Sequence, residues 1–122
     1  MAAGATSRLT LFSNILLGPV YPPVWLAKAT ASLDALSGGR LLLGLGVGGR
    51  PDDFAAMDRP FEQRGKLMDG TLDTLHRAWA GEEVTGDGVA VGPAPARGNR
   101  VPVLIGGTSD AAIRRTVQQA EG

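Results

Sequence analysis

The sequence predicts an α/β fold with a parallel sheet, and three observations predict it. Apolar runs that end in glycine, such as Leu41–Leu43 before Gly44, are typical of strands covered on both faces. Amphipathic stretches of helical length separate these runs. Their alternation is typical of βαβ units, which build parallel sheets. We expect one domain over residues 1–122, because this is a single-domain length.

The expected order is strand, helix, strand, helix, hairpin, strand and helix. The strands are expected at residues 8–17, 40–45 and 101–105, and the helices at residues 24–36, 61–80 and 110–120. A small hairpin is expected around Gly86-Asp87-Gly88, since short β-prone stretches flank these turn residues. The fold class is therefore a βαβαβα run with a hairpin insertion.

A stripe of apolar residues at helical spacing predicts the first helix: Trp25, Ala29, Leu33 and Leu36. We expect Trp25 to lie in the core. Gly38 follows this stripe, and glycine adopts the left-handed conformation that ends many helices. The second strand follows directly.

Residues 50–60 are polar and are expected to form a loop before the long second helix. The periodicity of that helix includes Leu72 and Trp79, and we expect Trp79 in the core. Gly65 and Gly70 each weaken such a helix by about 1 kcal/mol relative to alanine. Close packing against a strand would explain both glycines.

Thr108 or Ser109 is expected to cap the last helix, because hydroxyl side chains accept hydrogen bonds from the first free amides. Asp110 lies in the first turn, where a carboxylate favours the helix dipole. We expect Ile113 and Val117 on the inner face of this helix.

The composition excludes several classes of function. Twelve basic and twelve acidic residues give a net charge of zero, which argues against nucleic acid or an anionic membrane as the main partner. Cysteine is absent and His76 is the single histidine, so the sequence predicts no metal site. The apolar stretch 9–26 is broken by prolines, which argues against a membrane span and a signal peptide. We expect a cytoplasmic protein.

The candidate site lies where the strands end, because ligands of parallel α/β proteins bind beyond the carboxyl ends of the strands. Three strand exits are expected, namely Ser13-Asn14-Ile15, Gly46-Val47-Gly48-Gly49 and Gly106-Gly107-Thr108-Ser109. In the third exit, two glycines lead directly into a capped helix. The backbone amides at that helix start have no partner within the helix and favour a phosphate. The alternative is that the two glycines only form a tight turn.

Other candidate motifs are weaker. Gly44-x-Gly46-x-x-Gly49 matches the dinucleotide fingerprint by letter, but a polar segment follows where that fingerprint requires a helix. His76 has the pattern of a packed or surface helix residue rather than of a catalytic base. Asp52 and Asp53 are either a general-acid pair or, as we favour, solvated carboxylates of a loop or short helix. Arg64 is expected to be structural.

Six segments of the chain, in order and with the family's spacing, strongly resemble the luciferase-like flavin-dependent monooxygenases, which include enzymes that use the F-420 deazaflavin. These segments are Thr6–Leu11, Pro23–Lys28, Leu33–Arg40, Gly44–Phe54, Phe61–Gly65 and Val103–Ser109. The resemblance implies a partial TIM (β/α)8 barrel, equivalent to strands three to five with their helices. A complete barrel needs about 250 residues, so the first two and last three strands are absent.

The resemblance also implies the site residues. The cofactor-binding residues it implies are Ser13, Asn14, Ile15, Gly46, Val47, Gly48, Gly49, Gly106, Gly107 and Thr108. Asn14-Ile15 matches a bulge where many members carry a non-proline cis peptide behind the ring, and Gly106–Thr108 match the exit that holds the cofactor phosphate. Gly49 stands where some deazaflavin enzymes have a catalytic glutamate, so the sequence assigns no catalytic residue.

The resemblance implies an oxidoreductase that uses FMN or F-420 and acts on a small organic substrate, with molecular oxygen or by hydride transfer. Three open strands cannot close a barrel, so we expect the isolated chain to self-associate, to be poorly soluble, or to pair with a complementary half-barrel. The alternatives are a non-catalytic remnant or assembly module, and a small Rossmann-like nucleotide-binding domain.

Overall fold

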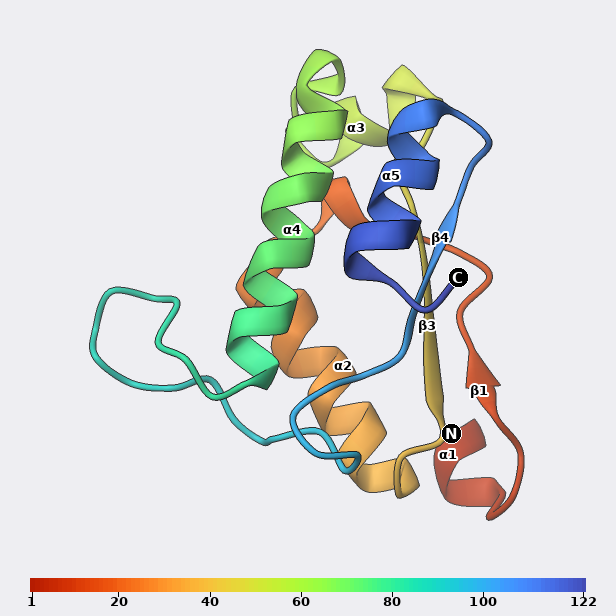
Figure 1. Cartoon of the computed structure of the whole chain (residues 1–122), viewed down its shortest axis with the longest axis vertical. Coiled ribbons are helices and arrows are strands. Elements are labelled where there is room, and N and C mark those ends of the chain that lie inside the picture. The colour runs from red at the N-terminus through yellow and green to blue at the C-terminus, as the bar shows by residue number, and fades with distance from the viewer.

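The computed structural model describes residues 1–122 as a short parallel sheet with helices packed along one side (Figure 1). The strands are β1 (Leu11–Phe12), β2 (Leu16–Leu17), β3 (Leu41–Gly46) and β4 (Val103–Gly106). The helices are α1 (Ala2–Ala5), α2 (Pro23–Ser37), α3 (Pro51–Ala56), α4 (Arg64–Trp79) and α5 (Asp110–Gln119), with 3-10 turns η1 (Gly18–Val20) and η2 (Phe61–Gln63). The expected α/β class is confirmed.

The sheet has β3 in its centre, with β1 and β2 along one edge and β4 along the other, all parallel. The expected first strand is interrupted. Phe12 pairs with Leu42, but Leu16 pairs with Leu45, so β1 and β2 are one strand with one extra residue. Such a residue is a β-bulge, and it falls at residues 13–15.

The core lies between β3 and the helices. Leu41, Leu43 and Leu45 point to this side, as the two-residue period of a strand requires. They pack with apolar residues of α2 and α4, including Leu72, and with residues of β4. The indole of Trp79 is buried and donates to the carbonyl of Ala27, 3.2 Å away, which ties α4 to α2. The core position expected for Trp79 is confirmed.

Three expectations about exposure are wrong. Trp25 is 57% exposed, and Ile113 and Val117 are 54% and 80% exposed. On α5 the buried positions are instead Ala112 and Arg115. Ala112 lies under the β4–α5 turn and Arg115 bonds to α4, and these contacts decide which face of the helix is covered.

Local structure departs from expectation in three further places. Residues 51–56 form α3 rather than loop, and Asp52 and Asp53 lie in its first turn, which confirms the short-helix alternative for these two residues. The hairpin is reduced to one antiparallel bridge, between Glu83 and Ala90. Gly65 faces the guanidinium of Arg115 rather than a strand, and a side chain at Gly70 would meet open space.

The last two residues return to the sheet. The amide of Glu121 donates to the carbonyl of Val103, and the amide of Ile105 donates to the carbonyl of Gly122, at 2.9 and 2.7 Å. These bonds occupy part of the outer edge of β4. No helix of the chain is both long enough and apolar enough to cross a lipid bilayer.

Candidate functional site

The carboxyl ends of the strands lie at one level. Leu17 at the end of β2 pairs with Gly46 at the end of β3, and Gly46 pairs with Gly106 at the end of β4. The segments that leave this level lead into α3 and α5. The expected exits of the second and third strands therefore meet at one edge of the sheet.

The start of α5 presents free backbone donors. The hydroxyl of Ser109 accepts from the amide of Ala112, 3.2 Å away, so Ser109 is the cap. The backbone amides of residues 107–111 have no acceptor within the protein. Free amides at a helix start bind anions, because they point at the ligand and carry the positive end of the helix dipole.

A hollow of about 440 Å³ opens beside this helix start. Its lining residues come from the β3 exit and from the starts of α4 and α5: Val47, Gly48, Glu62, Arg64, Gly65, Ser109, Ala111 and Arg115. The fold thus brings two of the predicted site residues, Val47 and Gly48, together with Ser109. The lining also contains two arginines that were not predicted for the site.

The two arginines of this hollow are held differently. Arg115 is 8% exposed and donates to both carboxylate oxygens of Asp69, at 2.6 and 3.2 Å, and to the carbonyl of Gly65, at 3.1 Å. Arg64 donates to the carbonyl of Phe61, at 3.1 Å, and lies over the phenyl ring of the same residue, 4.0 Å from its centre. The ion pairs of the chain do not include Arg64. Its positive charge is therefore free for an anionic ligand.

Residues Ser13–Ile15 form the bulge rather than a strand exit. The hydroxyl of Ser13 accepts from the amide of Gly44 at 2.9 Å and donates to its carbonyl at 3.1 Å. It thereby satisfies both backbone groups where the strand is interrupted. The peptide bond between Asn14 and Ile15 is cis, as the family resemblance implies.

The strand glycines make room for Ile15. A Cβ atom on Gly46 would lie 2.3 Å from its Cδ1 atom, and one on Gly106 would lie 3.1 Å from the same atom. A Cβ atom on Gly44 would lie 2.1 Å from the carbonyl oxygen of Ser13. These glycines are therefore required by the bulge, and Ile15, which is 42% exposed, forms the surface above them.

The remaining predicted glycines have separate roles. Gly48 and Gly107 have φ angles of +85° and +136°, which favour glycine. A Cβ atom on Gly107 would lie 3.0 Å from that of Ala112, so this glycine also permits the tight turn into α5. Gly49 faces open space. Gly107 therefore forms a tight turn, and the backbone amides beyond it are also free to bind an anion.

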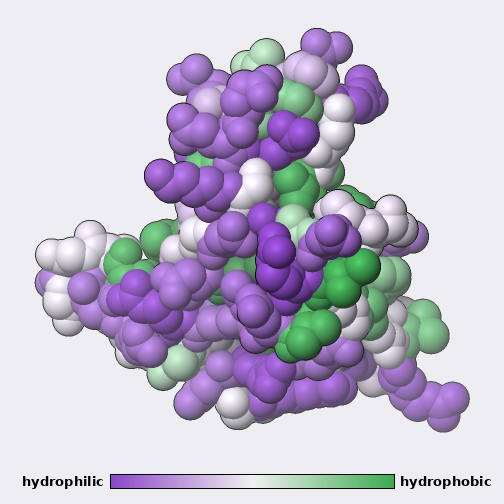
Figure 2. Space-filling view, turned by 45° about the horizontal axis from the view of Figure 1, so that its top comes forward, coloured by the Kyte–Doolittle hydropathy of each residue, from purple (hydrophilic) through white to green (hydrophobic).

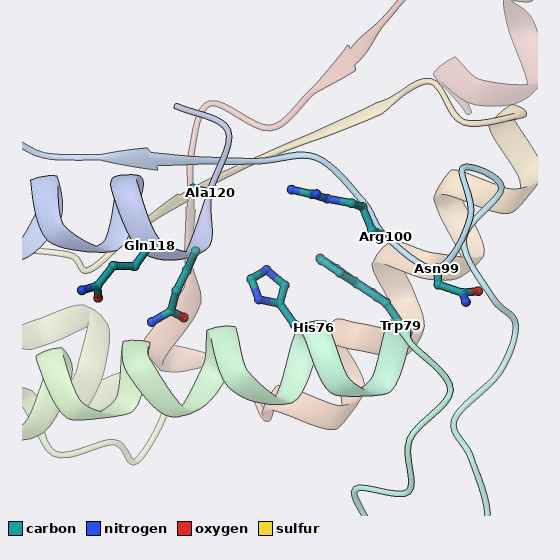
Figure 3. Close-up of a pocket in the computed structure, with 7 residues that line it drawn as sticks. His76, Trp79, Asn99, Arg100, Gln118 and Ala120 are labelled. Atoms are coloured by element: carbon teal, nitrogen blue, oxygen red, sulfur yellow. The ribbon is translucent and has the colours of Figure 1, made fainter.

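The opposite end of the sheet carries a second hollow, of about 330 Å³, between α4, α5 and the segment before β4 (Figure 3). His76 and Arg100 face it, and the rings of His76 and Trp79 lie 6.0 Å apart. Burial, followed by the charge of Arg100, lowers the pKa of His76. Arg100 itself forms an ion pair with Glu121. His76 is thus a packed helix residue remote from the strand exits, as expected.

The comparisons with known proteins agree with this geometry. The family model of the luciferase-like monooxygenases matches residues 1–122. An uncharacterized protein of Mycobacterium tuberculosis is 35% identical over 125 residues, which cover 96% of this chain and 43% of that protein. The chain thus spans less than half the length of this curated relative.

Two solved structures share the fold. Monooxygenase RslO1 from Streptomyces bottropensis superposes with a TM-score of 0.77 at 29% identity, over 85% of this chain and 34% of that one. The coenzyme F420 dependent tetrahydromethanopterin reductase of Methanopyrus kandleri gives 0.72 at 23% identity, over 98% of this chain and 40% of that one. This chain belongs to the luciferase-like monooxygenase family.

Proposed function

We propose that this chain carries part of the cofactor site of a flavin- or deazaflavin-dependent oxidoreductase, with FMN or F-420 as the cofactor. The observation that carries the proposal is the row of free amides at residues 107–111 beside a hollow lined by Arg64. The donor set fits a phosphate, since backbone amides and a guanidinium are both strong donors to phosphate oxygens. The family includes monooxygenases, and one structural neighbour is an F420 dependent reductase.

The proposed roles follow from position. Gly107 and Thr108 donate their amides to the phosphate, and Arg64 balances its charge. Val47, Gly48 and Gly49 lie along the cofactor tail at the β3 exit. The surface that Ile15 forms over Gly46 and Gly106, next to Asn14 in the chain, supports the ring. The bound cofactor would supply the redox chemistry, namely reaction with oxygen or hydride transfer to a small organic substrate.

A comparison of FMN with riboflavin tests the phosphate site, because riboflavin lacks the phosphate. We expect the chain to quench FMN fluorescence and to bind riboflavin about tenfold more weakly. Arg64→Met should remove most of this preference. Arg114→Met is the matched control, because Arg114 is exposed on α5 outside this hollow. Absence of quenching at high micromolar FMN would overturn the proposal.

A second candidate function is that of an assembly module, a non-catalytic partner of a complementary half-barrel. It is favoured because large apolar residues stay exposed along α2 and α5. Recovery of flavin reduction when the two halves are mixed would establish it. The Rossmann-like alternative is disfavoured, because β4 ends in Gly106-Gly107 without the acidic residue that such a site requires. A cytoplasmic location stays a prediction.

A further inference from the structure

The hollow between α4, α5 and the segment before β4 has no part in the proposed cofactor site. It lies at the opposite end of the sheet, and we call it the opposite hollow (Figure 3). Its volume of about 330 Å³ falls within the range of small-molecule sites, which is roughly 300 to 1,000 Å³. In Figure 2 hydrophilic surface (purple) covers most of the face on which α4 and α5 lie in Figure 1.

Polar side chains without partners in the chain surround the opposite hollow. They are His76 on α4, Asn99 before β4, and Gln118 and Gln119 at the end of α5, and none of the four hydrogen-bonds to another residue. The ring nitrogens of His76, which is half-buried, and the amide of Gln119 are also not sealed from solvent. The three amides each donate and accept. The opposite hollow therefore offers both kinds of hydrogen-bonding group to a ligand.

The end of α5 adds backbone acceptors. The amide of Ala120 donates to the carbonyl of Thr116, whereas the amide of Glu121 leaves the helix and donates to the carbonyl of Val103. The carbonyls of residues 117–119 therefore have no backbone donor, and they carry the negative end of the helix dipole. This end of α5 favours a ligand that donates hydrogen bonds.

The charges around the opposite hollow cancel. Arg100 forms an ion pair with Glu121 through one guanidinium nitrogen, and its other two nitrogens make no bond within the chain. Burial and the charge of Arg100 lower the pKa of His76, although the charge of Asp73 opposes them. An uncharged ligand is therefore favoured over an anion or a cation.

Flat side-chain groups border the same space. The ring of His76 rises from α4 between the end of α5 and the Arg100 side chain (Figure 3). It lies 6.0 Å from the ring of Trp79, and the planar guanidinium of Arg100 faces the hollow with it. Nucleobases stack on histidine rings and on guanidinium planes, and the amide of Gln or Asn forms a bidentate pair with adenine.

We propose that the opposite hollow binds the base of an adenine nucleoside. The amino group of the base donates to the free acceptors at the end of α5, and its ring nitrogens accept from the amide of Gln118 or Gln119. The base stacks on His76. Guanine fits less well, because Arg100, the side-chain type that reads guanine, is already held by Glu121.

Titration of the ¹⁵N-labelled chain with adenosine tests the proposal. Adenosine at millimolar concentration should shift the amides of residues 76, 99 and 118–120 and leave those of residues 107–111 in place. Purine riboside, which lacks the amino group, should bind about tenfold more weakly. AMP should bind no more tightly than adenosine, because the opposite hollow has no unbalanced charge for a phosphate.

Three results of these titrations would overturn the proposal. The first is the absence of shifts with adenosine, or shifts confined to residues 107–111. The second is tighter binding of guanosine than of adenosine. The third is an affinity for AMP tenfold above that for adenosine, which would show that the phosphate and not the base is recognised.

Matched variants locate the contact. The double variant Gln118→Leu with Gln119→Leu keeps similar side-chain volume but removes both amides, and it should weaken adenosine binding about tenfold or more. Gln63→Leu is the control, because Gln63 is exposed in η2 outside this hollow. Equal affinities in the two proteins would overturn the proposal. FMN binding beside the start of α5 should be the same in both, so the two proposals fail separately.

Discussion

The two ends of the sheet carry hollows whose basic residues are balanced differently. At the carboxyl ends, the hollow of about 440 Å³ lies beside free backbone amides and an arginine outside any ion pair, Arg64. At the opposite end, the hollow of about 330 Å³ has an arginine, Arg100, whose charge is balanced by Glu121. Its histidine, His76, is biased to the neutral form.

The backbone at a helix start, more than the number of basic side chains, distinguishes a site for anions. Both hollows have basic residues at their walls. The carboxyl-end hollow adds free main-chain donors at the start of α5, where the positive end of the helix dipole favours an anion. Donors held by the backbone need no rearrangement to meet a phosphate, so they provide a preformed site.

The largest expected effect comes from the turn that builds the carboxyl-end hollow. Gly107→Ala should destabilise the fold by about 2 to 3 kcal/mol, because its φ angle is +136° and the new Cβ atom would meet Ala112. Urea unfolding followed by circular dichroism measures this. Gly70→Ala is the control. It lies inside α4 with open space around it and should stabilise by about 1 kcal/mol. Equal effects of the two changes would contradict the role of Gly107.

A somewhat smaller loss is expected from the arginine that fixes α5 on α4. Arg115→Met removes two bonds to Asp69 and one to the carbonyl of Gly65, and should cost about 1 to 2 kcal/mol. Because Arg115 also lines the carboxyl-end hollow, the affinity for FMN should also fall in the Arg115→Met variant. Unfolding curves and FMN titration measure the two effects, and an unchanged stability would rule out the structural role.

Ser109 caps α5 at the edge of the carboxyl-end hollow. Ser109→Ala frees the amide of Ala112 and should destabilise by about 1 kcal/mol. Ser109→Asp keeps a capping oxygen but adds negative charge, so it should retain stability and weaken FMN binding. Thermal unfolding and fluorescence titration separate these outcomes. Unaltered FMN binding in Ser109→Asp would count against a phosphate at this helix start.

The smallest effect is expected at the opposite hollow. The pKa of His76 is lowered in the folded state, so the unfolded chain binds a proton first as the pH falls. The contribution of His76 to the free energy of unfolding is therefore complete above about pH 6.5 and declines as the pH falls below that value. Arg100 and Asp73 face this ring with opposite effects on its pKa. His76→Gln should flatten the pH dependence of the urea midpoint between about pH 7.5 and 5.5, and an identical slope in both proteins would contradict the assignment.

Most of the longer helices and strands could be predicted from the sequence, because local residue patterns determine them. The run Leu41–Leu43 predicts β3, and helical periodicity predicts α2, α4 and α5. The segment that forms α3 was expected as a loop, with a short helix only as an alternative for Asp52 and Asp53, although Pro51 at its first position and acidic residues in its first turn are ordinary helix-start patterns. The polar character of the segment outweighed them.

Contacts between distant residues account for the other errors. Ile113 and Val117 have the spacing of an inner face, but the bonds from Arg115 to α4 turn the opposite face inward. Trp25 has the spacing of a core residue, yet it lines an open apolar hollow between α2 and the bulged strand. Arg64 at the hollow was also missed, because its position beside the start of α5 depends on how α4 and α5 pack.

The most direct test is a ¹⁵N–¹H correlation spectrum of the labelled chain during titration with FMN and, separately, with riboflavin. We expect FMN to shift the backbone amides of residues 107–111, and riboflavin to leave them in place. The same shifts with riboflavin, or shifts confined to His76 and Arg100 at the opposite hollow, would contradict a phosphate site at the start of α5.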